Sequence, residues 1–328
     1  MRVLVTGGGG FLGSAICAAL RTRNDEVISY QRREASHLLP LGVYSIRGDL
    51  GNLEQLKRDS RGCDAVIHTA GKAGVWGDYE SYYQANVLGT ENVILACRAN
   101  AIPNLVYTSS PSVVHGGGDI EGGDESLPYP KRFSSPYPAT KSLGEQLVLA
   151  ANNDLLKTTA LRPHLIWGPG DPHLLPRLMA KAASGKLALP GGEKLIDTIY
   201  IENAAQAHIQ ALDVITQNGP ACGKTYFISN DEPLPQAEII SRLLDAAGMP
   251  TEITRVAPWI AKTAGFVAQN IWKLLRLESE PPVTRWSAKQ LSTAHWYDIS
   301  AAKKDLGYTP AISIEEGLER LRQHFAES

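Results

Sequence analysis

Short apolar runs alternate with helical patterns through the first half of the chain. The runs lie at residues 3–5, 26–30, 44–46, 65–68, 105–108 and 160–162. Between them, residues 11–20 and 86–98 place apolar side chains three or four positions apart, as a helix with one buried side does. This alternation predicts an α/β fold, a doubly wound parallel sheet of the Rossmann type. In such a fold the ligand-binding residues lie at the carboxyl ends of the strands.

Beyond residue 170 the simple alternation ends. We expect residues 1–170 to be mainly a dinucleotide-binding region and residues 171–328 to be mainly a smaller, C-terminal substrate-binding region. No Pro/Gly-rich linker divides them, so the two should share one cleft. Near the end, Leu306-Gly307 stops a helix, and Ser313 with Glu316 predicts a capping box for the last one.

Residues 256–275 form a broad amphipathic stretch that begins near Pro258. Its apolar positions recur at helical spacing, with Trp259, Phe266 and Trp272 beside them. The apolar positions are Val256, Ile260, Ala264, Val267, Ile271, Leu274 and Leu275, and the polar ones are Lys262, Gln269, Lys273 and Arg276. Two interpretations stay open: a core helix of the substrate region, or an entry for long alkyl chains that meets a membrane surface or a partner protein. Because few basic residues accompany it, strong attachment to anionic lipid is not expected.

The composition narrows the possible functions. The 328 residues carry a formal net charge of −2, which gives no reason to expect a nucleic-acid partner. Four scattered cysteines fit reduced thiols in the cytoplasm. Val3 already belongs to the first strand, so we expect no signal peptide, and no apolar run has the length of a membrane span. The eight histidines show no metal-ligand spacing, so we expect no metal, and we interpret His68, His164 and His208 as structural.

Four glycines follow the first strand, after Thr6. Gly7, Gly10 and Gly13 are spaced as G-x-x-G-x-x-G, and the helical pattern starts at Phe11 and Leu12. A strand that turns sharply into a helix needs glycine where its backbone approaches a ligand. The N–H groups at the start of that helix would face a pyrophosphate. This stretch predicts a dinucleotide site.

The ends of the next strands carry further candidate cofactor residues. After the second strand come Arg32 and Arg33, where an enzyme specific for NAD usually has a carboxylate. Two guanidinium groups favour the 2′-phosphate of NADP, although Glu34 could serve NAD, and a solvated basic turn is the alternative. Asp49, followed by Leu50, could accept a hydrogen bond from adenine or could cap a helix. Ala70 and Gly71 follow the fourth strand and complete this set.

The reactive centre is predicted at Tyr137 and Lys141. Their spacing of four places a phenol and an ammonium on one helix face, where the cation would lower the phenol pKa. Tyr137 could then exchange a proton near neutral pH. Ser109, Ser110 and Ser112 follow the fifth strand, and one hydroxyl there could polarise a reacting carbonyl; the others would be turn serines.

These motifs resemble the extended short-chain dehydrogenases/reductases, and within them the 3β-hydroxysteroid dehydrogenase/isomerase branch. The glycine loop, the Tyr137/Lys141 pair and residues 162–171 carry the resemblance. Residues 73–77, 107–113, 226–235 and 295–297 are similar to bacterial reductases that act on 2-alkyl-3-oxoalkanoates in long-chain olefin biosynthesis. The likeness covers nearly the whole chain and identifies residues near 197–212 as a segment that returns to the main region.

The resemblance implies roles for individual residues. Tyr137 would be the general acid/base, Lys141 would bind the nicotinamide ribose and lower the tyrosine pKa, and Ser110 would orient the carbonyl. Asn86 would hold the lysine through water, with a helix N-cap as the alternative. Pro163 and its neighbours would contact the nicotinamide carboxamide.

The expected activity follows from the same resemblance. NADPH, with NADH less favoured, would reduce the 3-oxo group of a long-chain 2-alkyl-3-oxoalkanoate. A 3β-hydroxysteroid or sterol dehydrogenase is the main alternative, and a nucleotide-sugar epimerase or a non-catalytic NADP sensor is less favoured. We also expect a homodimer, assembly with other olefin-pathway enzymes through residues 256–275, and a cytoplasmic location that includes the periphery of a membrane.

Overall fold

The computed structural model describes residues 1–74, 76–275, 277 and 279–327. Val75 and Arg276, which the sequence analysis used, lie outside the described residues, as does the side chain of Lys273.

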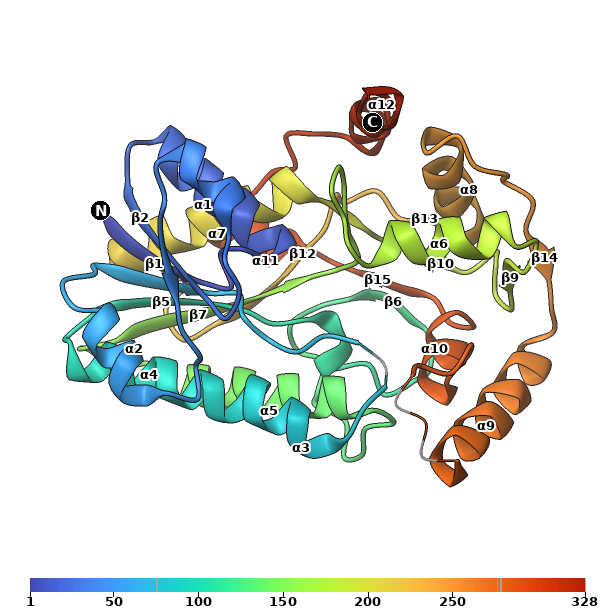
Figure 1. Cartoon of the computed structure of the whole chain (residues 1–328), viewed down its shortest axis with the longest axis horizontal. Helices are drawn as coiled ribbons and strands as arrows, with labels where there is room; N and C mark the ends of the chain where they lie inside the picture. Colours follow the sequence, from blue (N-terminus) through green and yellow to red (C-terminus); the bar gives the residue numbers. More distant parts are fainter. Residues whose placement is uncertain (75, 276, 278, 328) are drawn as a thin grey trace.

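A seven-stranded sheet forms the centre of the molecule, in the order β12-β7-β5-β4-β1-β2-β3 (Figure 1). Every pairing within it is parallel. The strands are β1 (Arg2–Thr6), β2 (Glu26–Gln31), β3 (Tyr44–Arg47), β4 (Ala65–His68), β5 (Asn104–Thr108), β7 (Lys157–Pro163) and β12 (Thr225–Ile228). The six predicted strands are confirmed, and β12 adds a seventh from the second half of the chain. The doubly wound parallel fold is confirmed as well.

Burial on both faces explains why these strands appear as continuous apolar runs. Along β1, Leu4 packs into the core on one face, whereas Val3 and Val5 pack into the core on the other. Successive side chains of a strand point to opposite faces, so each strand serves both layers of helices.

Two layers of helices cover the sheet, as Figure 1 shows, with α1, α7 and α11 on one face and α2, α4 and α5 on the other. The helices of the first half are α1 (Phe11–Thr22), α2 (Leu53–Asp59), α3 (Tyr79–Tyr83), α4 (Gly89–Ala99) and α5 (Pro136–Ala150). Those of the second half are α6 (Leu174–Ala183), α7 (Ile201–Thr216), α8 (Gln236–Ala246), α9 (Pro258–Leu274), α10 (Arg285–Gln290), α11 (Ser300–Leu306) and α12 (Ile314–Glu327).

The second half, together with the segment of β6 from the first half, builds a smaller lobe beside the carboxyl ends of the main strands (Figure 1). Its mixed sheet has the order β13-β10-β15-β6. The short strands are β6 (Ile120–Gly123), β8 (Ile166–Trp167), β9 (Ala188–Leu189), β10 (Leu195–Ile196), β11 (Ile199–Tyr200), β13 (Leu234–Pro235), β14 (Thr254–Arg255) and β15 (His295–Tyr297). From this lobe the chain runs back through α7, which packs against α1, and through β12.

Two predicted helix starts differ from the structure. Asn86 does not cap a helix: Asp78 accepts a hydrogen bond from the Ser81 backbone and begins a helical run that continues into α4. Asn86 therefore lies inside that run, in a π-helical turn over Gln84–Leu88. At the last helix, Ser313 accepts from the Glu316 backbone as predicted, but the Glu316 carboxylate pairs with Arg320 at 2.7 Å.

The helix predicted over residues 256–275 forms as α9, but its apolar stripe faces outward. Phe266 is 50% exposed and Ile271 is 43% exposed. Gly265 is buried instead, and a Cβ there would lie 2.8 Å from the Thr284 carbonyl oxygen beside α10. Gly265 thus allows the close backbone contact with the lobe, and the interpretation as a core helix is wrong.

Candidate active site

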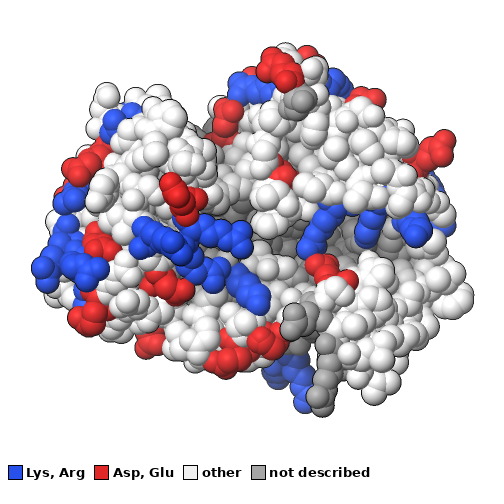
Figure 2. Space-filling view, in the orientation of Figure 1, with Lys and Arg blue, Asp and Glu red and all other residues white. Residues whose placement is uncertain are grey.

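A cavity of about 1530 Å³ runs along the carboxyl ends of the main strands and into the smaller lobe. Figure 2 shows a hollow across the middle of the molecule with Lys and Arg side chains on both sides. The predicted residues that border it are Gly7, Gly10, Phe11, Leu12, Gly13, Arg32, Arg33, Asp49, Leu50, Ala70, Gly71, Ser110, Tyr137 and Pro163. Residues from seven separate stretches of the sequence therefore meet in one space.

The glycine loop packs too tightly for side chains. A Cβ on Gly13 would lie 2.1 Å from the Gly7 carbonyl oxygen, so α1 could not approach the loop. Gly7 has a φ of +73°, and the Gly10 N–H donates to its carbonyl at 2.9 Å. The first N–H groups of α1, at Phe11 and Leu12, have no acceptor within the helix, because a helix leaves its first turn unsatisfied. These groups border the cavity and fit a pyrophosphate.

Arg32 and Arg33 follow β2 and are exposed at the cavity edge. Among the described residues, neither guanidinium has an ion-pair partner. Glu34 borders the same cavity. The two arginines fit a phosphate group on the adenosine ribose, as in NADP. The Glu34 carboxylate lies in the same turn, where it could instead bind ribose hydroxyls, as in NAD.

Asp49 closes a turn before α2 and does not cap that helix. Its Oδ1 accepts from the Gly51 N–H at 2.8 Å, which closes a turn. The cap of α2 is Asn52, which accepts from the Gln55 N–H at 3.1 Å, so Asp49 is not a helix cap. Asp49 is exposed and borders the cavity, and its contact with adenine stays a prediction.

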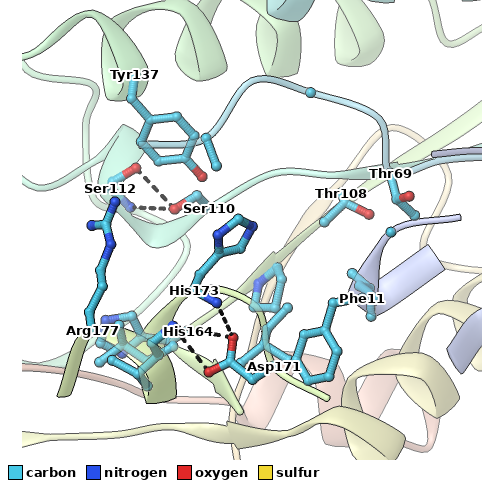
Figure 3. A pocket seen from close by; sticks show the side chains of 18 of the residues that line it. Phe11, Thr69, Thr108, Ser110, Ser112, Tyr137, His164, Asp171, His173 and Arg177 are labelled. Atoms are coloured by element: carbon cyan, nitrogen blue, oxygen red, sulfur yellow. Dashed lines mark hydrogen bonds between the residues drawn. The ribbon is translucent and has the colours of Figure 1, made fainter. Parts of the chain in front are cut away.

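Ser110 and Tyr137 come together at the middle of the cavity (Figure 3). Burial raises the pKa of Tyr137 above its ordinary value, and a hydrogen bond with Ser110 opposes that shift. The Ser110 and Ser112 hydroxyl oxygens are 2.9 Å apart. Ser109 is buried, and its hydroxyl has no hydrogen-bond partner among the described residues. Of the three serines, Ser110 is therefore the one that interacts with the phenol.

Lys141 lies behind Tyr137, one turn further along α5 and nearly buried. Its ammonium donates to the Thr108 carbonyl at 2.6 Å and lies 4.1 Å from the centre of the Tyr107 ring. Burial lowers the pKa of Lys141 to about 7, against an opposing effect of Glu145. The structure thus differs from the expected lowering of the Tyr137 pKa by Lys141, because here burial and Ser110 govern that phenol.

Asn86 ties together the segments around Lys141. Its Oδ1 accepts from the Lys72 N–H at 2.7 Å, and its Nδ2 donates to the Lys72 carbonyl and to Thr140, each at 3.0 Å. Thr140 is the neighbour of Lys141 on α5, so Asn86 fixes the helix to the loop after β4. A π-helical turn of this kind is frequent at functional sites. Its predicted water-mediated link to Lys141 stays a prediction.

Comparison with known proteins identifies the family to which this chain belongs. The profile of the 3-beta hydroxysteroid dehydrogenase/isomerase family matches residues 4–257. The chain belongs to this family. It is therefore an oxidoreductase of the extended short-chain dehydrogenase/reductase type, as the motifs predict.

Individual relatives and solved structures agree with that membership. A 2-alkyl-3-oxoalkanoate reductase of Stenotrophomonas maltophilia is 50% identical over 98% of both chains. A decarboxylating sterol-4-alpha-carboxylate 3-dehydrogenase of Mus musculus is 34% identical over 98% of this chain and 90% of its own. The structure of a Thermus thermophilus UDP-glucose 4-epimerase complex with NAD is 25% identical, covers 100% of both chains and gives a TM-score of 0.76.

A buried ion pair in this family member was not predicted from the sequence. Arg162 donates to both oxygens of Glu145, at 3.0 and 2.6 Å, and Tyr129 donates to the same carboxylate at 2.6 Å. The pair ties α5, the helix that carries Tyr137 and Lys141, to β7. Its two residues lie on different elements, and the position of Glu145 four residues after Lys141 was the available indication in the sequence.

A basic row along α6 was also missed. His173, Arg177 and Lys181 are spaced by four, which places them on one helix face, and all three border the cavity. The spacing was visible in the sequence. Nothing in the sequence indicated that this face of α6 meets the strand ends.

The histidines interpreted as structural occupy different settings. His68 and His208 are buried, and burial lowers the pKa of His68 to about 3 and that of His208 to about 4. His164 is held by Asp197 through a 2.5 Å hydrogen bond, and its ring also borders the cavity.

Within the described residues, no cluster of three or more potential metal ligands occurs. Among them, no helix combines the length and apolar character needed to cross a bilayer.

Proposed function

We propose that this protein uses NADPH to reduce the 3-oxo group of a long-chain 2-alkyl-3-oxoalkanoate to the 3-hydroxy acid, reversibly, in olefin biosynthesis. The observation that carries the proposal is the position of Ser110 and Tyr137. They lie where the cavity passes from the strand ends into an apolar pocket of the second lobe. The 50% identity to a 2-alkyl-3-oxoalkanoate reductase supports this substrate class.

Three side chains divide the chemistry of this reaction. NADPH supplies the hydride that adds to the carbonyl carbon. The Tyr137 phenol gives its proton to the carbonyl oxygen, and the Ser110 hydroxyl donates a hydrogen bond to the same oxygen. Lys141, whose neighbour Thr140 is held by Asn86, would bind the ribose hydroxyls of the nicotinamide nucleotide. Pro163, which borders the cavity, would contact the carboxamide.

The positive charge after β2 supports NADPH as the preferred cofactor. Arg32 and Arg33 are available at the cavity edge, and guanidinium groups bind phosphate oxygens in pairs. The N–H groups of α1 and the glycine loop hold the pyrophosphate. Residues 1–170 thus serve mainly the cofactor, and residues 171–328 mainly the substrate.

The second lobe offers the room that alkyl chains need. Its side of the cavity is built from aliphatic side chains of β10, α6, α8 and the segments around them. These side chains are Leu174, Leu178, Leu187, Leu189, Ile196, Ile239, Ile240 and Leu243. Each buried methylene of an alkyl chain contributes about 0.8 kcal/mol of transfer free energy.

The outward face of α9 is assigned to association. Its exposed side chains include Trp259, Phe266, Val267, Ile271 and Leu274. A contiguous apolar surface of this kind marks contact with a membrane surface or a protein. The expected contacts are the enzymes that make or use the poorly soluble substrate, a second copy of this chain, and the periphery of a membrane facing the cytoplasm.

A substrate panel tests the function. The purified protein is given NADPH or NADH with a long-chain 2-alkyl-3-oxoalkanoate or a 3-ketosteroid, and the loss of reduced cofactor is followed by absorbance. A UDP-sugar is incubated with the protein and NAD⁺, and its conversion is followed by chromatography, because epimerisation consumes no net cofactor. We expect turnover with the oxo acid and preference for NADPH. Faster turnover of the ketosteroid would favour a sterol dehydrogenase, conversion of the UDP-sugar an epimerase, and cofactor binding without any turnover a sensor.

A further inference from the structure

The basic row on α6, formed by His173, Arg177 and Lys181, borders the substrate side of the cavity. The start of α6 is firmly held, because the Asp171 carboxylate accepts from the backbone N–H groups of His173, Leu174 and Leu175. Because the first turn of α6 is held in this way, the three basic side chains have fixed positions along the wall of the cavity.

Arg177 is the permanent cation of this row that lies at the catalytic end. In Figure 3 its side chain extends along the same side of the cavity as Ser112 and Tyr137. Its charge and those of Glu280 and Tyr137 all act on the pKa of Tyr82, which places the four groups in one neighbourhood. Of the other described Arg and Lys residues that border the cavity, Arg32 and Arg33 follow β2, and Lys181 lies one turn further along α6.

Arg177 already binds a carboxylate of the chain itself. Its Nη2 donates to Glu280 Oε2 at 2.7 Å. Glu280 comes from the segment between α9 and α10 and borders the same cavity. Both side chains stay partly exposed, 53% for Arg177 and 37% for Glu280, so the pair is open to solvent and to an incoming anion. Exposed pairs of this kind are weak, and exchange of one carboxylate for another costs little.

We propose that Arg177 binds the carboxylate of the substrate, which replaces Glu280. The inference rests on the proposed function, because it concerns the acid group of a 3-oxo acid. In such an acid the carboxylate carbon is two bonds from the carbonyl carbon, so its binding group must lie near Ser110 and Tyr137. The planar guanidinium matches a carboxylate with two parallel hydrogen bonds. Arg177 therefore selects free acids over esters and ketones and fixes which face of the carbonyl meets the hydride.

The test compares an acid with its methyl ester in Arg177→Met. Because 3-oxo acids lose carbon dioxide spontaneously, oxidation of the 2-alkyl-3-hydroxyalkanoate by NADP⁺ is measured. Loss of a charge-assisted contact should lower kcat/KM for the acid by about 10- to 100-fold and change kcat/KM for the ester by less than about twofold. Equal losses for acid and ester, or no loss for the acid, would overturn the inference.

Glu280→Gln provides a test of opposite sign. Without the competing carboxylate, the KM for the acid should fall by about two- to tenfold, while the KM for the ester stays constant. A higher KM for the acid in Glu280→Gln would also contradict the exchange. Arg255→Met is the matched control, because Arg255 forms an exposed pair with Glu193 at 2.5 Å and does not border the main cavity.

The outcome separates this inference from the proposed function. If the wild-type protein converts neither acid nor ester with NADP⁺, the proposed function fails. If it converts both equally well and Arg177→Met changes neither, the function stands and the carboxylate assignment is wrong. Unchanged NADPH binding and an unchanged melting temperature in Arg177→Met show that the variant is folded.

Discussion

Lys141 and Glu145 lie one turn apart on α5, yet their surroundings give them different tasks. Glu145 is fully buried and paired with Arg162, so it holds α5 against β7. Breaking a buried pair on one side leaves an uncompensated charge, which makes this contact a firm positional constraint. Lys141, whose pKa burial lowers to about 7, donates to the Thr108 carbonyl at the end of β5. The helix that carries Tyr137 is thus fixed to two neighbouring strands of the sheet.

Tyr137→Phe tests the proton donor. Removing the phenol oxygen should lower kcat by about 10²- to 10⁴-fold, the usual contribution of a general acid. The affinity for NADPH, measured by fluorescence titration, should stay within about twofold. Tyr44→Phe, at an exposed position of β3, serves as the control. Undiminished turnover in Tyr137→Phe would refute the assignment.

Arg32→Ala combined with Arg33→Ala tests cofactor choice. Two charge-assisted contacts to a 2′-phosphate should be lost, so the Kd for NADPH should rise by about 10- to 100-fold while that for NADH changes little. Glu34→Gln provides the matched comparison, because a carboxylate that served NAD would weaken NADH when removed. Equal weakening of both cofactors in the arginine variant would show that the arginines do not bind the 2′-phosphate.

At the scale of single residues, motifs indicated which side chains to place at the candidate site. Gly13 was singled out by the glycine spacing after the first strand and Tyr137 by its spacing of four from Lys141, and both border the cavity in the structure. Arg177 belongs to no such motif, and its place depends on how the second lobe folds over the sheet. The pair of Glu145 and Arg162 depends on packing across two elements, which periodicity within one element does not show.

Among the elements, α9 shows why an apolar stripe does not fix the direction in which a helix faces. The periodicity correctly predicted the helix but left two interpretations open, a core face and a surface that meets a membrane or a partner. In the structure the contact with the lobe is made around Gly265, where the absence of a side chain allows close approach to the residues before α10. Close backbone packing needs small residues, so the large apolar ones stay exposed.

Phe266→Asp combined with Ile271→Asp tests the role of α9. Because both side chains are exposed, the double variant should fold, bind NADPH and melt within about 5 °C of the wild type, as expected for surface substitutions. Its turnover of long-chain substrate, or its retention on the other pathway enzymes or on phospholipid vesicles, should fall. Thr263→Asp with Asn270→Asp adds the same charge at exposed polar positions of α9 and controls for it. A double variant that keeps turnover and association would exclude both roles.

The helix around Asn86 shows a second limit at this scale. An Asn before an apolar pattern resembles an N-cap, but Asp78 caps the helix earlier, and the run passes through Asn86 with a π-helical turn. The amide is then free to bond Lys72 and Thr140 instead of its own backbone. The local sequence pattern predicts the existence of a helix reliably, but it predicts the residue at which the helix begins less reliably.

For the whole molecule, buried histidines set the response to acid. Burial lowers the pKa of His68 and His295 to about 3, and that of His115 and His208 to about 4, below the ordinary value of 6.5. Below pH 6.5 the unfolded chain therefore binds protons that the folded chain does not, so the contribution of these histidines to the free energy of unfolding falls as the pH is lowered to about 3. These side chains lie in both lobes, so acid weakens the sheet and the substrate lobe together.

His208→Gln tests this linkage with urea unfolding at pH 7 and pH 5. His208 donates from Nδ1 to the Ala204 carbonyl at 2.7 Å and accepts at Nε2 from the Thr108 hydroxyl at 2.8 Å. The variant should be less stable at pH 7, because a buried hydrogen bond is lost, at a cost of about 1–3 kcal/mol. It should then lose less stability than the wild type between pH 7 and pH 5, because one proton-binding difference has been removed. His37→Gln, the same substitution at an exposed position, is the matched control. The same pH dependence in His208→Gln as in the wild type would show that this imidazole is protonated equally in the folded and unfolded chains.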